Sequence, residues 1–266
     1  MSVVVVFAAQ SAIAADFATE VMDATFKLFD RDCTSTCFLV RREVPDTAYY
    51  LVTTAHSVEG TKGETVVLVL RKQLPDGSYV RHDHRIAVRR GDKPLWVRHE
   101  TEDVSVLRLS EPMPVPVTAL PASMIADEAR LKASAVHICS PLFVLTYPQR
   151  FEANGAGFPV ARQGIFASPP LLPLPKHRTF LADFTTFAGD SGGPVFIAGA
   201  DGHPLVVGIV FSQQFHDDRV KSDYEDRLTR HPLGVGKVLH AQYVLDTLDV
   251  AAAQTEPIPD ISTATD

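Results

Sequence analysis

The sequence predicts an all-β fold made of two six-stranded Greek-key β-barrels followed by a short C-terminal helix. Short β-prone runs recur along the 266-residue chain, and its 15 Gly and 19 Pro are spread between them, which is typical of many short strands. The proline-rich residues 111–116 separate two sets of such runs. Because proline has no N–H to donate to a sheet, we expect this stretch to connect the two barrels.

The first set of expected strands lies in residues 25–110 and provides about the six strands that one Greek-key barrel needs. These strands are Thr25–Phe29, Cys37–Arg41, Tyr49–Thr53, Thr65–Arg71, Tyr79–Val88, Leu95–Val97 and Val104–Leu109. The second set lies in residues 133–240, after a short helix expected at Ser123–Lys132. Its strands are Ala135–Cys139, Phe143–Thr146, Phe158–Ala161, Gly164–Ala167, Phe180–Phe184, Val195–Ala198 and Leu205–Phe211.

Three segments complete the prediction. Gln213–Pro232 is polar and rich in charges, so we expect a solvated loop over one end of the barrel, with a position over a cleft as the alternative. Val244 and Leu248 are four residues apart, which predicts a C-terminal helix over residues 240–248. Residues 249–266 are small, polar and acidic, which is typical of a disordered tail.

Charge and hydropathy exclude several functions. The formal net charge is −7, so no basic surface indicates nucleic acid as a partner. No apolar run reaches the ~20 residues that span a bilayer. Residues 1–14 contain an apolar run and a small-residue site, as in a secretory signal peptide, but no Lys or Arg. We expect a secreted or periplasmic protein; an upstream start and an ordinary first element of a cytoplasmic protein are the alternatives.

The three cysteines cannot form a fully paired disulfide framework. Cys33 and Cys37 are close enough in sequence to pair across a tight turn, which would leave Cys139 over. Three free thiols are the simpler interpretation. Because no histidine pair lies near the first two cysteines, we expect no zinc site, and no metal or other cofactor.

Three short motifs carry the candidate chemistry. Ser191 lies between glycines in a turn within residues 187–194, His56 ends an apolar run, and Asp103 begins another. A serine hydroxyl needs a base to take its proton as it attacks, and a histidine titrates near neutral pH. A carboxylate at the mouth of a buried strand is costly unless it is paired. The chain order His, Asp, Ser therefore predicts a catalytic triad.

Other assignments of these motifs fit less well. Asp92 lies in a turn and Asp83 lies between two histidines, so neither precedes an apolar strand as Asp103 does. Residues 189–193 also fit the G-x-S-x-G elbow of α/β-hydrolases, but that elbow needs a helix after the serine and a later histidine. Here β-like residues follow Ser191, and His56 precedes it.

The remaining histidines have ordinary explanations. His82 and His84 share one face of an expected strand and are interpreted as surface residues, with a metal pair as the alternative. His137 is expected to be a core or edge residue. The run His216-Asp217-Asp218 is expected in a solvated loop, with cation binding as the alternative.

At its three motifs the sequence resembles the trypsin-like, chymotrypsin-fold serine peptidases, bacterial type, without flanking disulfides or a PDZ domain. The resemblance spans about residues 25–248, within a peptidase domain at 15–248. It implies that His56 and Asp103 come from the first barrel and Ser191 from the second, with the triad in the seam. It also implies hydrolysis of polypeptide substrates through an acyl-enzyme. The backbone N–H groups of Gly189 and Ser191 are expected to form the oxyanion hole.

The resemblance also raises two questions about this chain. In zymogen-type members, a newly cut N-terminus pairs with the acidic residue before the serine; Asp190 is present here, but no such cleavage site is, so Asp190 must find another partner or stay solvated. The substrate pocket is expected at Thr185, Phe211 and Gln213, which carry no charge, so we expect a small or medium uncharged residue before the scissile bond. A catalytically silent binding module of the same fold is the alternative to a serine endopeptidase.

Overall fold

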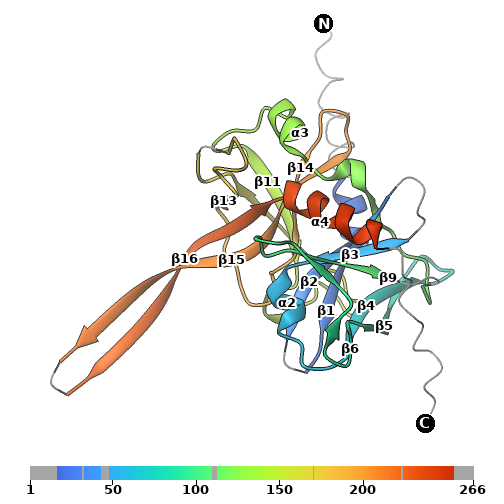
Figure 1. The fold of residues 1–266 in the computed structure, drawn as a ribbon, viewed down its shortest axis with the longest axis horizontal. Coiled ribbons are helices and arrows are strands. Elements are labelled where there is room, and N and C mark those ends of the chain that lie inside the picture. Colours follow the sequence, from blue (N-terminus) through green and yellow to red (C-terminus); the bar gives the residue numbers. More distant parts are fainter. Residues whose placement is uncertain are drawn as a thin grey trace, which may run out of the picture.

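Two β-sheets pack against each other, with a helix lying across their junction (Figure 1). The computed structural model describes residues 17–31, 33–42, 48–109, 113–169, 171–222 and 224–254. The predicted all-β class with a short C-terminal helix is confirmed. The predicted signal peptide at 1–14 and residues 255–266 of the predicted tail lie outside the described residues.

The first sheet holds eight strands and the His56 motif. Their bounds are β1 Thr25–Phe29, β2 Thr34–Arg41, β3 Tyr49–Thr53, β4 Thr65–Gln73, β5 Tyr79–Ala87, β8 Val97–Arg98, β9 Ser105–Leu109 and β10 Leu120–Pro121. The order is β5-β4-β1-β2-β3-β9-β8, and β10 pairs with β2. Helix α2 (Ala55–Glu59) follows β3, and β6 (Arg89–Arg90) pairs with β7 (Lys93–Pro94) in a separate hairpin. β1 and β3 have the predicted bounds because their β-branched and aromatic residues favour strands.

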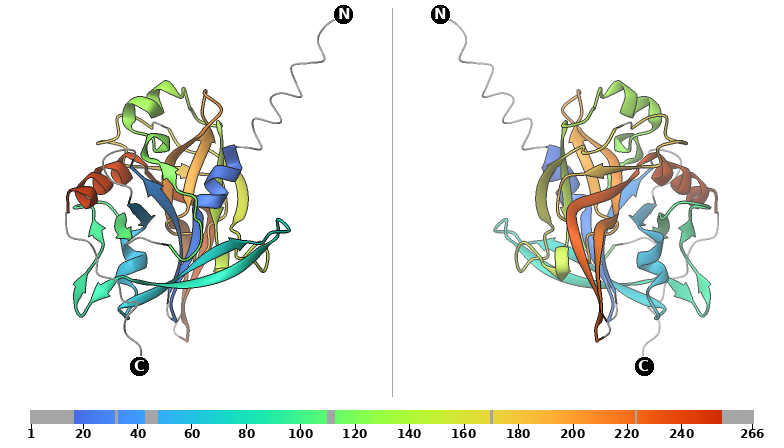
Figure 2. Two further views of the ribbon diagram at one scale, coloured as in Figure 1. Left: turned by 90° about the vertical axis from the view of Figure 1, so that its right-hand side faces the viewer. Right: turned by 90° about the vertical axis from the view of Figure 1, so that its left-hand side faces the viewer.

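The second sheet holds six strands and ends in the C-terminal helix. The strands are β11 Pro141–Thr146, β12 Val160–Ile165, β13 Thr179–Ala182, β14 Pro194–Ala198, β15 Pro204–Lys221 and β16 Asp226–His240, in the order β12-β11-β14-β15-β16-β13. The helical elements around it are η1 Ala122–Met124, α3 Glu128–Ala133, η2 Pro148–Arg150 and α4 Gln242–Ala253. Helix α4 packs against β9 of the first sheet and β16 of the second (Figures 1 and 2).

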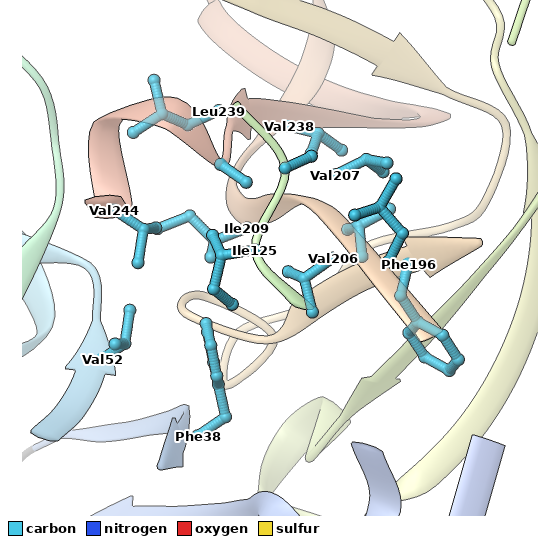
Figure 3. Close-up of a cluster of buried hydrophobic side chains, with 14 of the residues drawn as sticks. Phe38, Val52, Ile125, Phe196, Val206, Val207, Ile209, Val238, Leu239 and Val244 are labelled. Carbon is cyan, nitrogen blue, oxygen red and sulfur yellow. The ribbon is translucent and has the colours of Figure 1, made fainter. Parts of the chain in front are cut away.

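One hydrophobic core crosses the junction of the two sheets. Phe38 and Val52 of the first sheet belong to the same buried cluster as Ile209 and Val238 of the second and Val244 of α4 (Figure 3). All five side chains are at most 1% exposed. Because interiors pack as densely as organic crystals, this shared core fixes the two sheets relative to each other.

Two predicted elements between the sheets differ from the structure. The strand predicted at Ala135–Cys139 is wrong: these residues form turns, and the φ angles of Ala135 (52°) and Cys139 (68°) lie in the left-handed region that strands do not use. The helix predicted at Ser123–Lys132 is split into η1 and α3. The split occurs because Asp127 caps α3, accepting a hydrogen bond from the Arg130 N–H at 2.7 Å.

The charged segment Gln213–Pro232 is not a loop, which corrects the sequence-based prediction. Strands β15 and β16 continue through it as a long hairpin that projects from the body of the molecule (Figure 1). We call its outer part, Phe215–Lys221 and Asp226–Leu233, the arm. Its charges pair across the two strands, as Asp217 does with Arg230 at 2.8 Å. Because both faces of these strands carry polar residues, the sequence lacks the alternation of apolar and polar residues that predicts a half-buried strand.

Helix α4 begins and ends later than predicted. It runs to Ala253, five residues beyond the expected end at Leu248. The extension follows because Val244, Leu248 and Ala251 are all buried on one face of the helix.

Candidate active site

The pairing of β3 with β9 brings His56 and Asp103 to the same end of the first sheet. Thr53, the last residue of β3, lies opposite Ser105, the first residue of β9. His56 follows Thr53 by three residues, and Asp103 precedes Ser105 by two. Helix α2 begins at Ala55, so its first turn carries His56.

Two hydrogen bonds join His56 to Asp103. The imidazole Nδ1 lies 2.6 Å from Asp103 Oδ2, and the His56 backbone N–H donates to Oδ1 at 2.9 Å. Burial of the carboxylate acts to raise its pKa, but the hydrogen bonds from the His56 ring and backbone outweigh burial, and the pKa of Asp103 is lowered. Asp103 is therefore ionised at neutral pH and orients a ring that is itself half exposed.

Ser191 lies in the loop between β13 and β14, which docks on the ends of β2 and β3. The Thr36 N–H donates to the Ser191 carbonyl at 2.9 Å. Gly192 has a φ of +86°, and a side chain there would collide with Thr53 Oγ1. Thr53 precedes His56 closely, so the loop and the imidazole meet at the same seam. Among the described residues no hydrogen bond joins the Ser191 hydroxyl to His56, and such bonds often tighten only when substrate binds.

Neighbouring residues fix the backbone conformation at Gly189. The Thr36 hydroxyl donates to the Gly189 carbonyl at 2.8 Å. Gly189 has a φ of +97°, and a side chain there would collide with the Tyr147 carbonyl, so only glycine fits. Within the described part of the chain, the N–H groups of Gly189 and Ser191 donate no hydrogen bond. Both donors remain available to a ligand.

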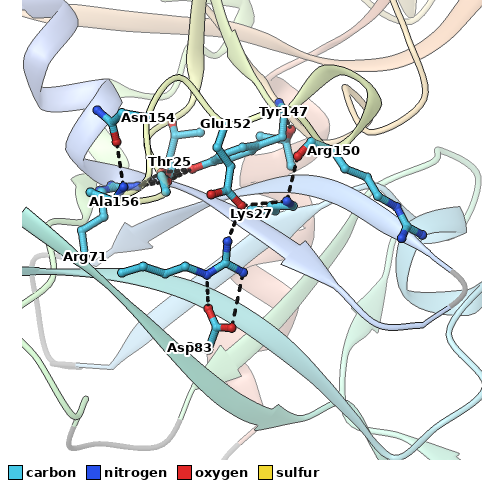
Figure 4. A network of polar contacts seen from close by, with 12 residues as sticks. Thr25, Lys27, Arg71, Asp83, Tyr147, Arg150, Glu152, Asn154 and Ala156 are labelled. Atoms are coloured by element: carbon cyan, nitrogen blue, oxygen red, sulfur yellow. Dashed lines mark hydrogen bonds and ion pairs between the residues drawn. The ribbon is translucent and has the colours of Figure 1, made fainter.

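The turn η2 supports this loop from the side of the first sheet. The Gln149 N–H donates to the Ala188 carbonyl at 2.7 Å. Lys27 Nζ donates to the Arg150 carbonyl at 2.8 Å and pairs with Glu152 at 2.7 Å (Figure 4). The lysine belongs to β1, so the first sheet contacts the serine loop through this turn.

Asp190 is paired internally. Its side chain is 1% exposed, and Oδ2 lies 2.8 Å from Arg162 Nη2 and accepts from the Phe187 N–H at 2.8 Å. The same guanidinium donates to the Thr185 carbonyl at 2.5 Å and to the Thr146 hydroxyl at 2.6 Å. Arg162 is therefore the charged partner of Asp190, which the sequence analysis left open.

The predicted pocket residues lie around the base of the β15–β16 hairpin. Gln213 lies opposite Gly236, and a Cβ on Gly236 would approach the Thr186 methyl group to 2.8 Å. Thr185 is exposed, whereas Phe211 is half buried against the core. The Thr186 side chain is buried, and its hydroxyl has no hydrogen-bond partner among the described residues.

The other histidines that the sequence analysis named lie on other elements. His82 and His84 lie on β5, and His216 lies on the arm. His137 is exposed in a turn, which corrects its assignment as a core or edge residue: its ring bonds the Ile138 carbonyl at 2.7 Å. The described part of the chain contains no group of three or more His, Cys, Asp or Glu residues that would hold a metal ion.

Two further features concern the cysteines and the helices. Cys33, Cys37 and Cys139 are all free thiols, and burial raises the pKa of Cys37. Over the described ranges, none of the helices has the length and apolar character needed to cross a membrane.

Sequence reasoning missed Arg162 and Thr186. Arg162 lies in a strand predicted as two pieces on either side of it, and its partner Asp190 is 28 residues away, so no local pattern indicates the pair. Thr186 follows the predicted pocket residue Thr185, and only the fold shows which of the two points inward.

The chain is similar to known proteins in two comparisons. A family model described as a trypsin-like peptidase domain matches residues 35–209, a span that contains His56, Asp103 and Ser191. Among solved structures, the chain is similar to Rv3671c from M. tuberculosis H37Rv, crystallised as an inactive serine-to-alanine mutant. The identity is 20%, the match covers 94% of this chain and 96% of that chain, and the TM-score is 0.46. No curated protein sequence matches the chain.

Proposed function

The chain belongs to the trypsin-like peptidase domain family, and from that premise we propose that it is a serine endopeptidase acting through Ser191, His56 and Asp103. One observation carries the proposal. Asp103 binds both the ring and the backbone of His56, at the seam on which the Ser191 loop docks. This arrangement matches the roles of base and orienting carboxylate that a serine nucleophile requires.

In the proposed reaction, Ser191 Oγ attacks the substrate carbonyl and His56 Nε2 takes the hydroxyl proton. Asp103 keeps the Nδ1 proton in place and stabilises the imidazolium that forms. His56 then gives its proton to the leaving amine, and an acyl-enzyme remains on Ser191. Water deprotonated by His56 attacks the acyl carbon, releases the acid and regenerates the serine.

The negative charge on the attacked carbonyl oxygen needs donors that are in place before the reaction. The free N–H groups of Gly189 and Ser191 are the proposed donors. Loss of one such donor typically costs about 3 to 4 kcal/mol of transition-state stabilisation. Because Gly189 is held by the Thr36 hydroxyl and Asp190 by Arg162, the loop has its partners without a cut N-terminus.

A fluorophosphonate probe tests the proposal directly. We expect the parent protein to be labelled on Ser191, Ser191→Ala to be unlabelled and inactive with its fold intact, and Ser134→Ala, directly after helix α3, to behave as the parent. Labelling is located by mass spectrometry of the digested protein. A correctly folded parent that is neither labelled nor able to cleave an unfolded protein is a silent module, and the proposal then fails.

We also propose that the residue before the scissile bond is small or medium-sized and uncharged. Thr185 carries no charge, its carbonyl is already bound by the Arg162 cation, and the Lys237 ammonium lies 5.2 Å from the Phe211 ring centroid. A buried substrate Arg or Lys would therefore meet these cations, and none of Thr185, Phe211 and Gln213 carries a negative charge to pair with it. Chromogenic peptides that differ only at this residue measure the preference. Fastest cleavage after Arg or Lys would refute the pocket assignment.

A further inference from the structure

The arm begins at the candidate active site. Strand β15 pairs with β14 through Pro204–Ile209. Val210 then accepts a backbone hydrogen bond from the loop that carries Ser191 and donates one to it, at 2.7 and 2.9 Å. From Phe211 to Lys221, no other strand in the described ranges pairs with this edge of β15. A free strand edge therefore starts one residue beyond the serine loop.

The arm is held together by its own contacts and not by the body of the molecule. Its β15 side chains are exposed from Phe215 to Lys221. Asp217 pairs with Arg230, and Arg219 donates to Asp226 at 2.8 Å. These pairs cross between the two strands, so they stabilise the hairpin while leaving the outer backbone of β15 accessible.

The two outer edges of the hairpin differ in their ability to accept another strand. β16 carries Pro232, which has no N–H to donate. β15 has no proline between Phe211 and Lys221, and among the described residues the N–H and C=O groups along its outer edge have no backbone partner. Unpaired edges of this kind are templates for pairing with another chain, and the β15 edge is the better template.

We propose that the arm extends the substrate-binding edge, so that the part of a polypeptide preceding the scissile bond adds to β15 as an antiparallel strand. The inference rests on the proposed function, because Ser191 fixes where the scissile bond lies. β15 runs away from Ser191, so a chain that reaches Ser191 from the tip of the arm runs antiparallel to it, which is the more stable pairing. The predicted pocket residue Gln213 lies on β15 at the base of the arm.

The substrate class that fits this edge is an extended or unfolded polypeptide. At about 3.3 Å per residue, the edge from Phe211 to Lys221 accommodates a strand of roughly ten residues. Main-chain hydrogen bonds supply the affinity in strand addition, so the arm would select for length and extension of the substrate. A short peptide would occupy only the base of the hairpin.

Trimming the arm tests this inference. In the variant, residues 215–233 are replaced by an Asn-Gly turn, which keeps Phe211, Gln213 and Gly236. Two anilide substrates share the four residues before the reporter group, and one carries six further residues at its N-terminus. We expect the parent to hydrolyse the longer substrate with at least a tenfold higher kcat/KM. The trimmed variant should hydrolyse both at the parent's rate for the short one.

A control on the substrate side isolates the main-chain bonds. N-methylation of alternate residues in the extension removes N–H donors but keeps the side chains, and it should abolish the gain in the parent. Equal kcat/KM for the two substrates in the parent, or a gain that survives trimming or N-methylation, overturns the inference while the proposed function stands.

Binding to the Ser191→Ala form separates the inference from catalysis. Fluorescence polarisation of the labelled long peptide should give a Kd at least tenfold weaker for Ser191→Ala with the trimmed arm than with the full arm. This result supports the inference even if the parent shows no hydrolysis; equal affinities overturn it. Analytical ultracentrifugation adds the last outcome: if trimming converts a dimer to a monomer without changing the length preference, the arm binds a second copy and the inference is wrong.

Discussion

At the scale of single residues, the candidate site depends on two carboxylates, each of which pairs with one basic side chain. Asp103 bonds both the ring and the backbone N–H of His56. An asparagine amide at position 103 can still accept a hydrogen bond from the His56 backbone N–H. Toward the imidazole, however, it presents a neutral donor or acceptor in place of the negatively charged carboxylate. The imidazole then loses both its fixed tautomer and the charge that stabilises the imidazolium.

We therefore predict that Asp103→Asn lowers kcat by about 10⁴-fold while KM changes little. Steady-state kinetics on a chromogenic peptide measure the effect. Asp92→Asn is the matched control, because Asp92 is exposed in a turn and should leave kcat unchanged. A loss of only a few-fold in Asp103→Asn would mean that another group orients His56.

Asp190 is a second carboxylate of this kind, and Arg162 is its partner. The Asp190 side chain is 1% exposed, and its Oδ1 has no hydrogen bond to any described residue. Removing the cation leaves a buried charge unpaired, which typically costs about 3 to 5 kcal/mol. Asp190 directly precedes Ser191, so we expect the loss of its partner to lower catalytic activity as well as stability.

We predict that Arg162→Gln lowers the free energy of unfolding by about 3 kcal/mol and lowers kcat at least tenfold. Urea unfolding and peptide hydrolysis measure the two effects. The surface pair of Arg98 with Glu59, each about half exposed, gives the control: Arg98→Gln should cost less than about 1 kcal/mol. Adding Asp190→Asn to Arg162→Gln should restore stability. An unchanged unfolding midpoint in Arg162→Gln would show that the pair contributes nothing.

At the scale of elements, the sequence predicts what local patterns encode and misses what distant partners decide. The spans of β1 and β3 and the His56, Asp103 and Ser191 motifs were predictable, because strand propensity and turn residues act over a few neighbours. The β15–β16 hairpin was not predictable, because its charges pair across the two strands, as Asp217 does with Arg230. The sequence of each strand alone is typical of a solvated loop.

The turn η2 is another feature that only the fold decides. Gln149 and Arg150 have φ angles of 52° and 67°, which residues other than glycine rarely adopt. The bond of Lys27 to the Arg150 carbonyl and its pair with Glu152 hold the turn in this conformation. Both partners are largely buried, at 10% and 13% exposure, so solvent screens this pair weakly.

We predict that Lys27→Met destabilises the protein by about 2 kcal/mol, because it removes the charged hydrogen bonds to the Arg150 carbonyl and to Glu152. Arg81 stays paired with Glu152 and limits the loss. Adding Glu152→Gln should recover part of the loss, and the double-mutant cycle gives the coupling between the two residues. The free energies come from denaturant unfolding. Additive effects of the two substitutions would contradict a direct interaction.

At the scale of the whole molecule, stability depends on a core that joins both sheets and α4, and His240 lies within that core. The His240 side chain is 1% exposed, and its ring centroid lies 4.9 Å from that of Phe180. Neither ring nitrogen has a hydrogen-bond partner among the described residues. Burial, and to a lesser extent the charge of His177, lower the pKa of His240 to about 4.

The lowered pKa makes stability depend on pH with a definite sign. The unfolded chain takes up the His240 proton near the ordinary pKa of about 6.5, whereas the folded protein does so only near 4. The unfolded state therefore binds more protons between these values, so stability is full above about pH 6.5 and is lost as pH falls toward 4. The loss from this residue reaches about 3 kcal/mol, at about 1.4 kcal/mol per pKa unit.

We predict that moving from pH 7 to pH 4.5 costs the parent roughly 2 to 3 kcal/mol more than it costs His240→Phe or His240→Leu. Urea unfolding followed by far-UV circular dichroism at both pH values gives the free energies. Two apolar replacements of different shape are needed, because a packing defect shifts stability equally at both pH values and cancels in the difference. His82→Phe, on β5 outside this core, is the control and should keep the full pH dependence of the parent. If the apolar variants at 240 lose as much as the parent on acidification, His240 is not the residue whose protonation opens the core.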